Sequence, residues 1–174
     1  MINQLPSPFV VEWLPRIARL VPPPARALDL ASGRGRHTRL LARAGFHAFG
    51  VDLDRSALVE TLATARADAL RVSVWCADLT TAPIPREAFE VVLVTRYLDR
   101  GRFPDICASV RGGGVVLYET FTIGQRAHRG GPRSPSHLLE LDELRRRFDG
   151  FEVLFYEEVR EPEALARIVA RKPV

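Results

Sequence analysis

The sequence predicts an α/β fold: seven strands in a mostly parallel sheet with an antiparallel last strand, and helices on both faces. Short apolar runs alternate with amphipathic stretches along the 174-residue chain, which is typical of this class. Runs such as VVLV at 91–94 and VVLY at 115–118 are apolar throughout, as expected of strands covered on both faces. The length suits one domain, so we expect residues 1–174 to fold as a unit.

The expected elements follow from these patterns and from residues that start or stop them. Strands are expected at residues 27–30, 48–52, 71–76, 90–95, 114–119, 152–157 and 165–170. Helices are expected at residues 8–20, 36–44, 55–70, 104–110 and 141–148. Asp54 suits the N-cap of the third helix, Gly45 suits the end of the second, and Pro15 is expected to kink or split the first.

The C-terminal end of the chain carries further information on topology. Only residues 158–164 separate the last two strands, and a parallel crossover needs about a dozen residues. These strands are therefore expected to pair antiparallel. Dinucleotide-binding dehydrogenase domains instead end on a parallel strand, so this ending argues against them.

Composition favours a cytoplasmic protein. The two cysteines, Cys76 and Cys107, have no metal or redox spacing, no signal peptide is recognisable, and no run approaches the ~20 apolar residues that cross a membrane. Of 25 basic residues only Lys172 is lysine, and the net charge is +4. The arginines are spread along the chain rather than clustered among aromatics, so nucleic acid is not expected as a partner. We expect no metal site.

The first strand leads into a glycine-containing turn, ALDLASGRGRHT. Asp29 ends the strand, and Ala31, Gly33 and Gly35 form a turn in which glycine lets the backbone approach a ligand closely. A dinucleotide site would have a third glycine at position 38, where this chain has Thr38.

Acidic residues also follow the next two strands. Asp52, with Leu53 beside it, lies 23 residues after Asp29, where a carboxylate can bind ribose hydroxyls. Asp78 follows the third strand, where its carboxylate could accept from an adenine amine, although an aspartate there is also ordinary turn chemistry. Ala77 and Leu79 would supply backbone donors and an apolar wall.

These segments, with the strand at 90–95 and the turn and strand at 112–119, resemble the successive motifs of class I S-adenosylmethionine-dependent methyltransferases. The segment from TRYLDRGRFPD to YETFTIGQ more narrowly resembles the small tellurite-resistance-type methyltransferases. The resemblance implies a Rossmann-like methyltransferase fold with S-adenosylmethionine as cofactor. The residues it implies for cofactor binding are Asp29, Ala31, Gly33, Gly35, Asp52, Leu53, Ala77, Asp78, Leu79 and Thr95. The family usually has glycine where Ala31 stands.

The catalytic candidates are Tyr97 and Glu119, which follow the fourth strand and end the fifth. Tyr97 could equally be a pocket wall and Glu119 a salt-bridge partner. Methyl transfer depends on alignment of the acceptor, and a thiolate or oxyanion acceptor needs no general base.

The expected acceptor is a small molecule or oxyanion, held by the N-terminal helix region (1–21) over the pocket and by a lid at 121–137 that contains Arg126, Arg129 and Arg133. The alternatives are a non-catalytic cofactor-binding module, an NAD-dependent oxidoreductase and an RNA methyltransferase. The protein is expected to be a monomer or homodimer.

Overall fold

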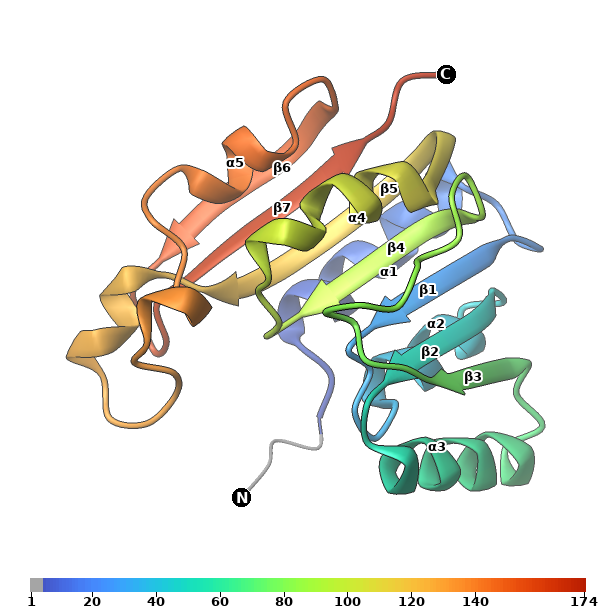
Figure 1. Cartoon of the computed structure of the whole chain (residues 1–174). Coiled ribbons are helices and arrows are strands. Elements are labelled where there is room, and N and C mark those ends of the chain that lie inside the picture. The colour runs from blue at the N-terminus through green and yellow to red at the C-terminus, as the bar shows by residue number, and fades with distance from the viewer. Residues whose placement is uncertain (1–4) are drawn as a thin grey trace.

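A seven-stranded sheet runs through the middle of the molecule in the computed structural model, which describes residues 5–174 (Figure 1). Its strand order is β3-β2-β1-β4-β5-β7-β6. The strands are β1 (Arg26–Leu30), β2 (His47–Asp52), β3 (Val72–Cys76), β4 (Phe89–Thr95), β5 (Val110–Phe121), β6 (Glu152–Val159) and β7 (Leu165–Arg171). All seven strands expected from the sequence are confirmed.

The strand directions also follow the expectation. Strands β3, β2, β1, β4 and β5 pair in parallel, whereas β7 lies antiparallel to both β5 and β6. The register of β5 and β7 runs from Val115 opposite Arg171 to Phe121 opposite Leu165. The short connection at 160–164 thus allows only a hairpin, which reaches the same sheet edge as the carboxyl ends of β4 and β5.

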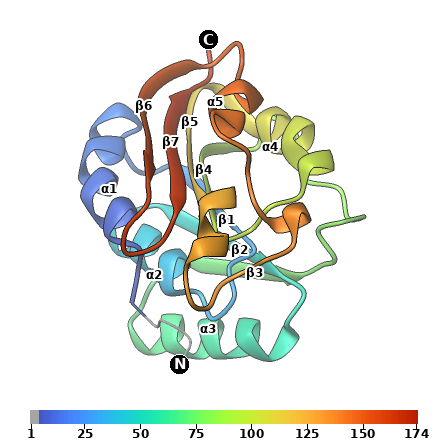
Figure 2. The same ribbon diagram turned by 90° about the vertical axis from the view of Figure 1, so that its left-hand side faces the viewer.

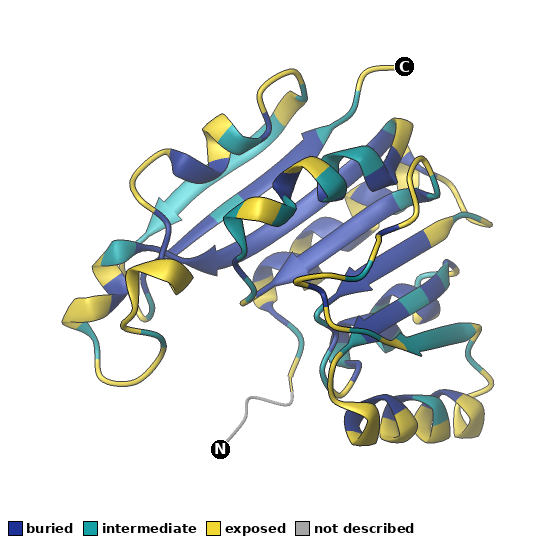
Figure 3. Cartoon of the chain, in the orientation of Figure 1, coloured by how far each residue is buried: buried dark blue, intermediate teal, exposed yellow. Residues whose placement is uncertain are grey.

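Helices cover both faces of the sheet, as Figure 2 shows edge-on. Helices α1 (Pro8–Leu20) and α2 (Arg36–Arg43) lie on one face, α4 (Phe103–Ser109) and α5 (Glu143–Arg147) lie on the other, and α3 (Arg55–Ala67) packs beside β2 and β3. Each face has its own apolar cluster. Between them the apolar runs at 91–94 in β4 and 115–118 in β5 are fully buried (Figure 3), as expected of strands covered on both faces.

The helix boundaries show which sequence signals controlled them. The Asp54 carboxylate accepts hydrogen bonds from the backbone N–H groups of Ser56 (2.9 Å) and Ala57 (3.1 Å), so it is the N-cap of α3 as predicted. Gly45 follows α2 with φ +95°, as expected of a helix stop. Helix α1 continues through Pro15, which lies on the exposed face of the helix, so the proline does not split it.

The segment at 121–137 is anchored rather than free. It contains the short 3₁₀ turns η2 (Ile123–Ala127) and η3 (Pro135–His137). The buried Gln125 side chain accepts from the Ala164 N–H (2.8 Å) and donates to the Gly130 carbonyl (3.3 Å). The segment is therefore tied to the β6–β7 turn.

Candidate functional site

A cleft of about 960 Å³ opens at the carboxyl ends of β1, β2 and β4. Strand β1 lies between β2 and β4, so the cleft lies where the order of the parallel strands reverses, the usual ligand position in open α/β sheets. The side chains and backbone that line it come from the glycine turn, the starts of α2 and α3, the end of β4 and the β6–β7 turn. They are Ala31, Ser32, Gly33, Arg34, Arg36, His37, Arg39, Asp52, Asp54, Ala57, Glu60, Thr64, Thr95, Arg96, Tyr97, Pro162 and Glu163.

The turn after β1 has left-handed backbone at three positions: Ala31 (φ +59°), Gly33 (φ +52°) and Gly35 (φ +66°). The Gly33 N–H donates to Asp52 Oδ2 at 2.7 Å, and the Asp54 N–H donates to Asp52 Oδ1 at 2.9 Å. Asp52 therefore links the first two strand ends, and each carboxylate oxygen keeps further capacity to accept hydrogen bonds on the cleft side.

Asp29 lies fully buried beneath the turn. Its Oδ2 accepts a hydrogen bond from Thr38 Oγ1 at 2.6 Å, whereas its Oδ1 has no partner within residues 5–174. Burial raises the pKa of this carboxyl to about 7. Thr38 stands at the position where a dinucleotide site has its third glycine, and its hydroxyl holds Asp29 instead.

His37 joins three elements around the cleft. Its Nε2 accepts from the Ser7 N–H at 2.9 Å, so the ring proton lies on Nδ1, which donates to Thr95 Oγ1 at 3.2 Å. Burial, with help from Arg36 and Arg96, lowers the pKa of His37 to about 3, and the imidazole is neutral. The partners of His37 are too distant in the chain to be found from local sequence patterns.

Thr95 and Tyr97 line the cleft as expected. The Tyr97 Oη atom is buried without a hydrogen-bond partner in the described chain, and burial raises its pKa. The phenol is therefore protonated at neutral pH and available as a donor.

Seven predicted residues lie outside the set that lines the cleft among residues 5–174. Two of them, Asp29 and Gly35, belong to the strand and turn directly beneath it, and the other five are Leu53, Ala77, Asp78, Leu79 and Glu119. Leu53 is exposed and Leu79 is a core residue. Asp78 accepts from the N–H and Oγ1 of Thr80, which is turn chemistry. Glu119 is buried and forms a 2.6 Å ion pair with Arg167, the salt-bridge alternative considered for it.

The arginines of the 121–137 segment also differ from the expectation of an anion-binding lid. Arg126 donates to the Arg133 carbonyl, and Arg133 donates to the carbonyls of Arg126 and His128. These side chains hold the segment together, and the cationic groups that line the cleft are instead Arg34, Arg36, Arg39 and Arg96.

Comparison with known proteins identifies the family. Residues 27–112, about half of the chain, match the model of a methyltransferase domain. The chain belongs to the class I S-adenosylmethionine-dependent methyltransferases. Among curated proteins no sequence matches it.

Solved structures share the fold of this chain. TehB from Haemophilus influenzae has a TM-score of 0.73 at 22% identity, and the match covers 91% of this chain and 61% of that one. An S-adenosylmethionine-dependent methyltransferase from Mesorhizobium loti gives 0.73 at 18% identity, covering 92% and 97%. Phosphoethanolamine N-methyltransferase 2 from Haemonchus contortus, in complex with S-adenosyl-L-methionine, gives 0.75 at 18%, covering 99% and 55%. The chain thus spans less than two thirds of TehB and of the Haemonchus protein.

Within residues 5–174 the methyltransferase has no helix long and apolar enough to cross a membrane, and no group of three side chains arranged to hold a metal ion.

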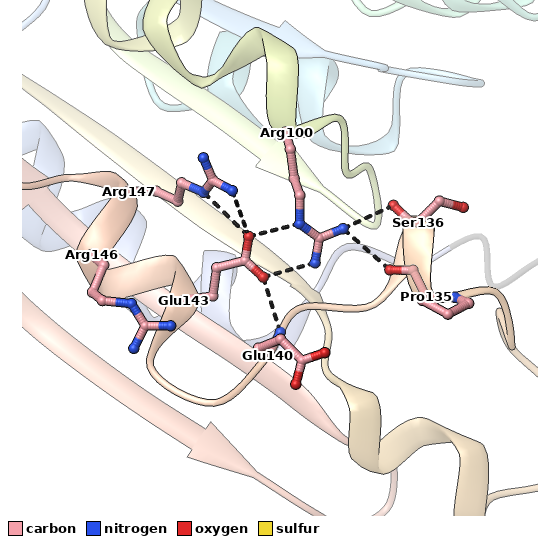
Figure 4. Close-up of a pocket in the computed structure, with 7 residues that line it drawn as sticks. All are labelled: Arg100, Pro135, Ser136, Glu140, Glu143, Arg146 and Arg147. Atoms are coloured by element: carbon pink, nitrogen blue, oxygen red, sulfur yellow. Dashed lines mark hydrogen bonds and ion pairs between the residues drawn. The ribbon is translucent and has the colours of Figure 1, made fainter.

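A second cavity of about 640 Å³, which shares no lining residue with the cleft, lies between η1 (Arg100–Arg102), η3 and α5 (Figure 4). Arg100 donates to both oxygens of Glu143 (2.8 and 2.7 Å), and Arg147 donates to Oε1 at 2.8 Å. Although burial acts to raise it, these arginines lower the pKa of Glu143 to about 2. Arg100 also donates to the carbonyls of Pro135 and Leu138. The network ties the segment at 135–138 to η1 and α5.

Replacing Ala31 with glycine is expected to stabilise the methyltransferase by about 0.5–1 kcal/mol, because an alanine at φ +59° is strained. Urea unfolding measures the gain. Ala69→Gly is the matched control, since Ala69 has φ +53° at the end of α3 and lies outside the cleft. Equal gains with equal adenosylhomocysteine affinity would show that the Ala31 methyl does not crowd the cleft. A tighter complex for the Ala31 variant alone would show that it does.

Proposed function

We propose that this protein transfers a methyl group from S-adenosylmethionine to a small-molecule acceptor. The observation that carries the proposal is the pair of carboxylates at adjacent strand ends, Asp29 with its unpartnered oxygen and Asp52 facing the cleft, on either side of a glycine turn. The cleft volume of about 960 Å³ suits a nucleoside-sized ligand together with an acceptor.

The residues present fit the cofactor group by group. The free Asp29 Oδ1 suits an ammonium group, the remaining acceptor capacity of Asp52 suits ribose hydroxyls, and the turn at Gly33 offers close backbone approach. Adenine contacts by Leu53, Ala77, Asp78 and Leu79 remain part of the proposal. When bound, the cofactor supplies an activated methyl group on a positively charged sulfur.

The chain's contribution to chemistry is alignment. Thr95 and Tyr97 line the cleft beyond the glycine turn and would orient the acceptor. Alignment of the reacting groups can lower the activation barrier of a displacement by roughly 7–11 kcal/mol in the best cases. His37 has both ring nitrogens engaged and Glu119 is paired with Arg167, so neither serves as a base. This supports an acceptor that is already a nucleophile at neutral pH, such as an oxyanion or thiolate.

We further infer a cytoplasmic protein, supported by the free thiols of Cys76 and Cys107. A non-catalytic cofactor-binding module would bind the cofactor without turnover of any acceptor. An RNA methyltransferase would show RNA binding that weakens steeply with salt.

The test of the cofactor assignment is calorimetry with adenosylhomocysteine, using NAD as the competing ligand. Asp52→Ala is expected to weaken adenosylhomocysteine binding about 10–100-fold, because hydrogen bonds to a charged acceptor contribute roughly 1.5–3 kcal/mol each. Asp68→Ala is the control, since Asp68 is a surface aspartate paired with Arg43 at 2.5 Å and outside the cleft. Binding of NAD but not adenosylhomocysteine, or unchanged affinity in Asp52→Ala, would refute the assignment.

A further inference from the structure

The cleft has a cationic side formed by the residues that follow β4 and begin α2. Arg96 comes directly after Thr95 and has left-handed backbone, φ +56°. Its guanidinium carbon lies over the Phe121 ring, 5.1 Å from the ring centroid, and its Nη2 lies 2.5 Å from Glu163 Oε2. Arg36 is close enough to Arg96 that the two positive charges lower the pKa of Arg36, after the larger effect of burial.

Glu163 reaches this side from the β6–β7 turn, which belongs to a different part of the chain. Both members of the pair are about one third exposed (34% and 33%), and a single Nη2–Oε2 contact joins them. Partly solvated ion pairs with one contact contribute ~0–1 kcal/mol. A guanidinium binds a carboxylate or another oxyanion best through two parallel hydrogen bonds, which this pair does not make. The pair is therefore easily exchanged for a better anion.

Neighbouring groups favour an anion at this place. Arg36 and Arg96 both line the cleft and place two positive charges near one another there. Asp29 and Glu119 are the other carboxylates near Arg36. Asp29 accepts a hydrogen bond from Thr38 at 2.6 Å, and Glu119 is paired with Arg167 at 2.6 Å. Among the described residues, Glu163 is thus the carboxylate that faces Arg96 across the cleft.

We infer that Arg96 binds an anionic oxygen of the methyl acceptor, and that Glu163 occupies this position until the acceptor displaces it. The inference rests on the proposed methyltransferase function and specifies its substrate class as a small carboxylate or related oxyanion. An acceptor oxygen lone pair forms the new O–CH₃ bond as the S–CH₃ bond of the cofactor breaks. The carboxylate becomes a neutral ester, the sulfonium becomes a thioether, and no proton is released, in keeping with a site whose histidine is fully engaged.

The test is calorimetric titration of the adenosylhomocysteine complex with benzoate, a simple carboxylate probe, with neutral benzamide alongside. Arg96→Gln is expected to weaken benzoate binding about 10–100-fold and leave benzamide unaffected. Glu163→Gln is expected to tighten benzoate binding about 2–5-fold, because the internal competitor is removed. Arg43→Gln is the control: it removes the same charge from a residue that is paired with Asp68 and lies outside the cleft, and it should change nothing.

The variants also separate this inference from the function on which it rests. Adenosylhomocysteine affinity should be the same in wild type, Arg96→Gln and Glu163→Gln. If adenosylhomocysteine binds but benzoate does not, or if Glu163→Gln weakens benzoate binding, the acceptor assignment is wrong and the cofactor assignment stands. If Glu163→Gln abolishes turnover of an acceptor without tightening benzoate, Glu163 is a general base and the inference fails. If the wild-type protein does not bind adenosylhomocysteine, the proposed function itself is refuted.

Discussion

Gly35→Ala is expected to destabilise the protein by about 2–5 kcal/mol. Gly35 has φ +66°, which costs an alanine roughly 1–2 kcal/mol, and its backbone lies directly against the side chain of Thr61 on α3. An added Cβ would lie 2.5 Å from Thr61 Oγ1 and still closer to its methyl carbon. Thr61 is buried and its hydroxyl donates to the Ala57 carbonyl, so it cannot move away without further loss. Urea unfolding with a constant m-value measures the change.

Two further variants separate the backbone contribution from the packing contribution. Gly33 has φ +52°, but an added Cβ there meets no atom within 4 Å, so Gly33→Ala should cost only about 1–2 kcal/mol. Combining Gly35→Ala with Thr61→Ala should recover part of the stability lost by the single change. Equal costs at the two glycines, with no recovery, would show that contact between the turn and α3 does not limit this position.

The fold was accessible from the sequence because its signals are local. VVLV in β4 and VVLY in β5 are buried on both faces, and apolar runs of this kind have few alternatives in a mixed α/β chain. The antiparallel ending followed from the length of one connection. The helix ends were less accurate: α3 stops at Ala67 instead of residue 70, because Asp68 forms its C-cap and Ala69 turns to φ +53°.

The candidate site was predicted only as far as strand ends allow. Asp29, Asp52, Thr95 and Tyr97 lie at one sheet edge because parallel strands place their carboxyl ends together. The contacts that determine the chemistry join residues far apart in sequence: Ser7 with His37, His37 with Thr95, and Arg96 with Glu163. A hydrophobic pattern carries no information on such pairs. The Arg-rich loop shows a different limit of local patterns, since the charges of Arg126 and Arg133 are close in sequence but bind loop carbonyls.

Asp29→Asn is expected to stabilise the protein without ligand by about 2–4 kcal/mol at pH 8. Burial raises the pKa of Asp29 from 3.8 to about 7, a change to which Asp52 adds slightly and which Thr38 and Arg36 oppose. Between about pH 4 and 7, Asp29 is therefore protonated in the folded state and ionised in the unfolded state. Wild-type stability should fall as pH rises through this window, because each pKa unit corresponds to 1.36 kcal/mol. The variant lacks this titration, so its advantage should be absent near pH 4, grow as pH rises through this window and be complete above pH 7, as measured by urea unfolding at each pH.

The same change is expected to weaken adenosylhomocysteine binding, since the unpartnered Oδ1 loses the charge that suits an ammonium group. Wild-type affinity should rise between pH 6 and 8 as Asp29 ionises. The D29N variant reports how much of any such change comes from the ligand's own amine, because only the ligand titrates in it. If the variant is more stable than the wild type at pH 8 but binds adenosylhomocysteine more weakly, the charge of Asp29 lowers the stability of the free protein and strengthens the complex. If Asp29→Asn instead lowers stability at pH 8, the carboxylate is ionised and stabilised in the free protein, and the unpartnered oxygen is not what draws the cofactor into the cleft.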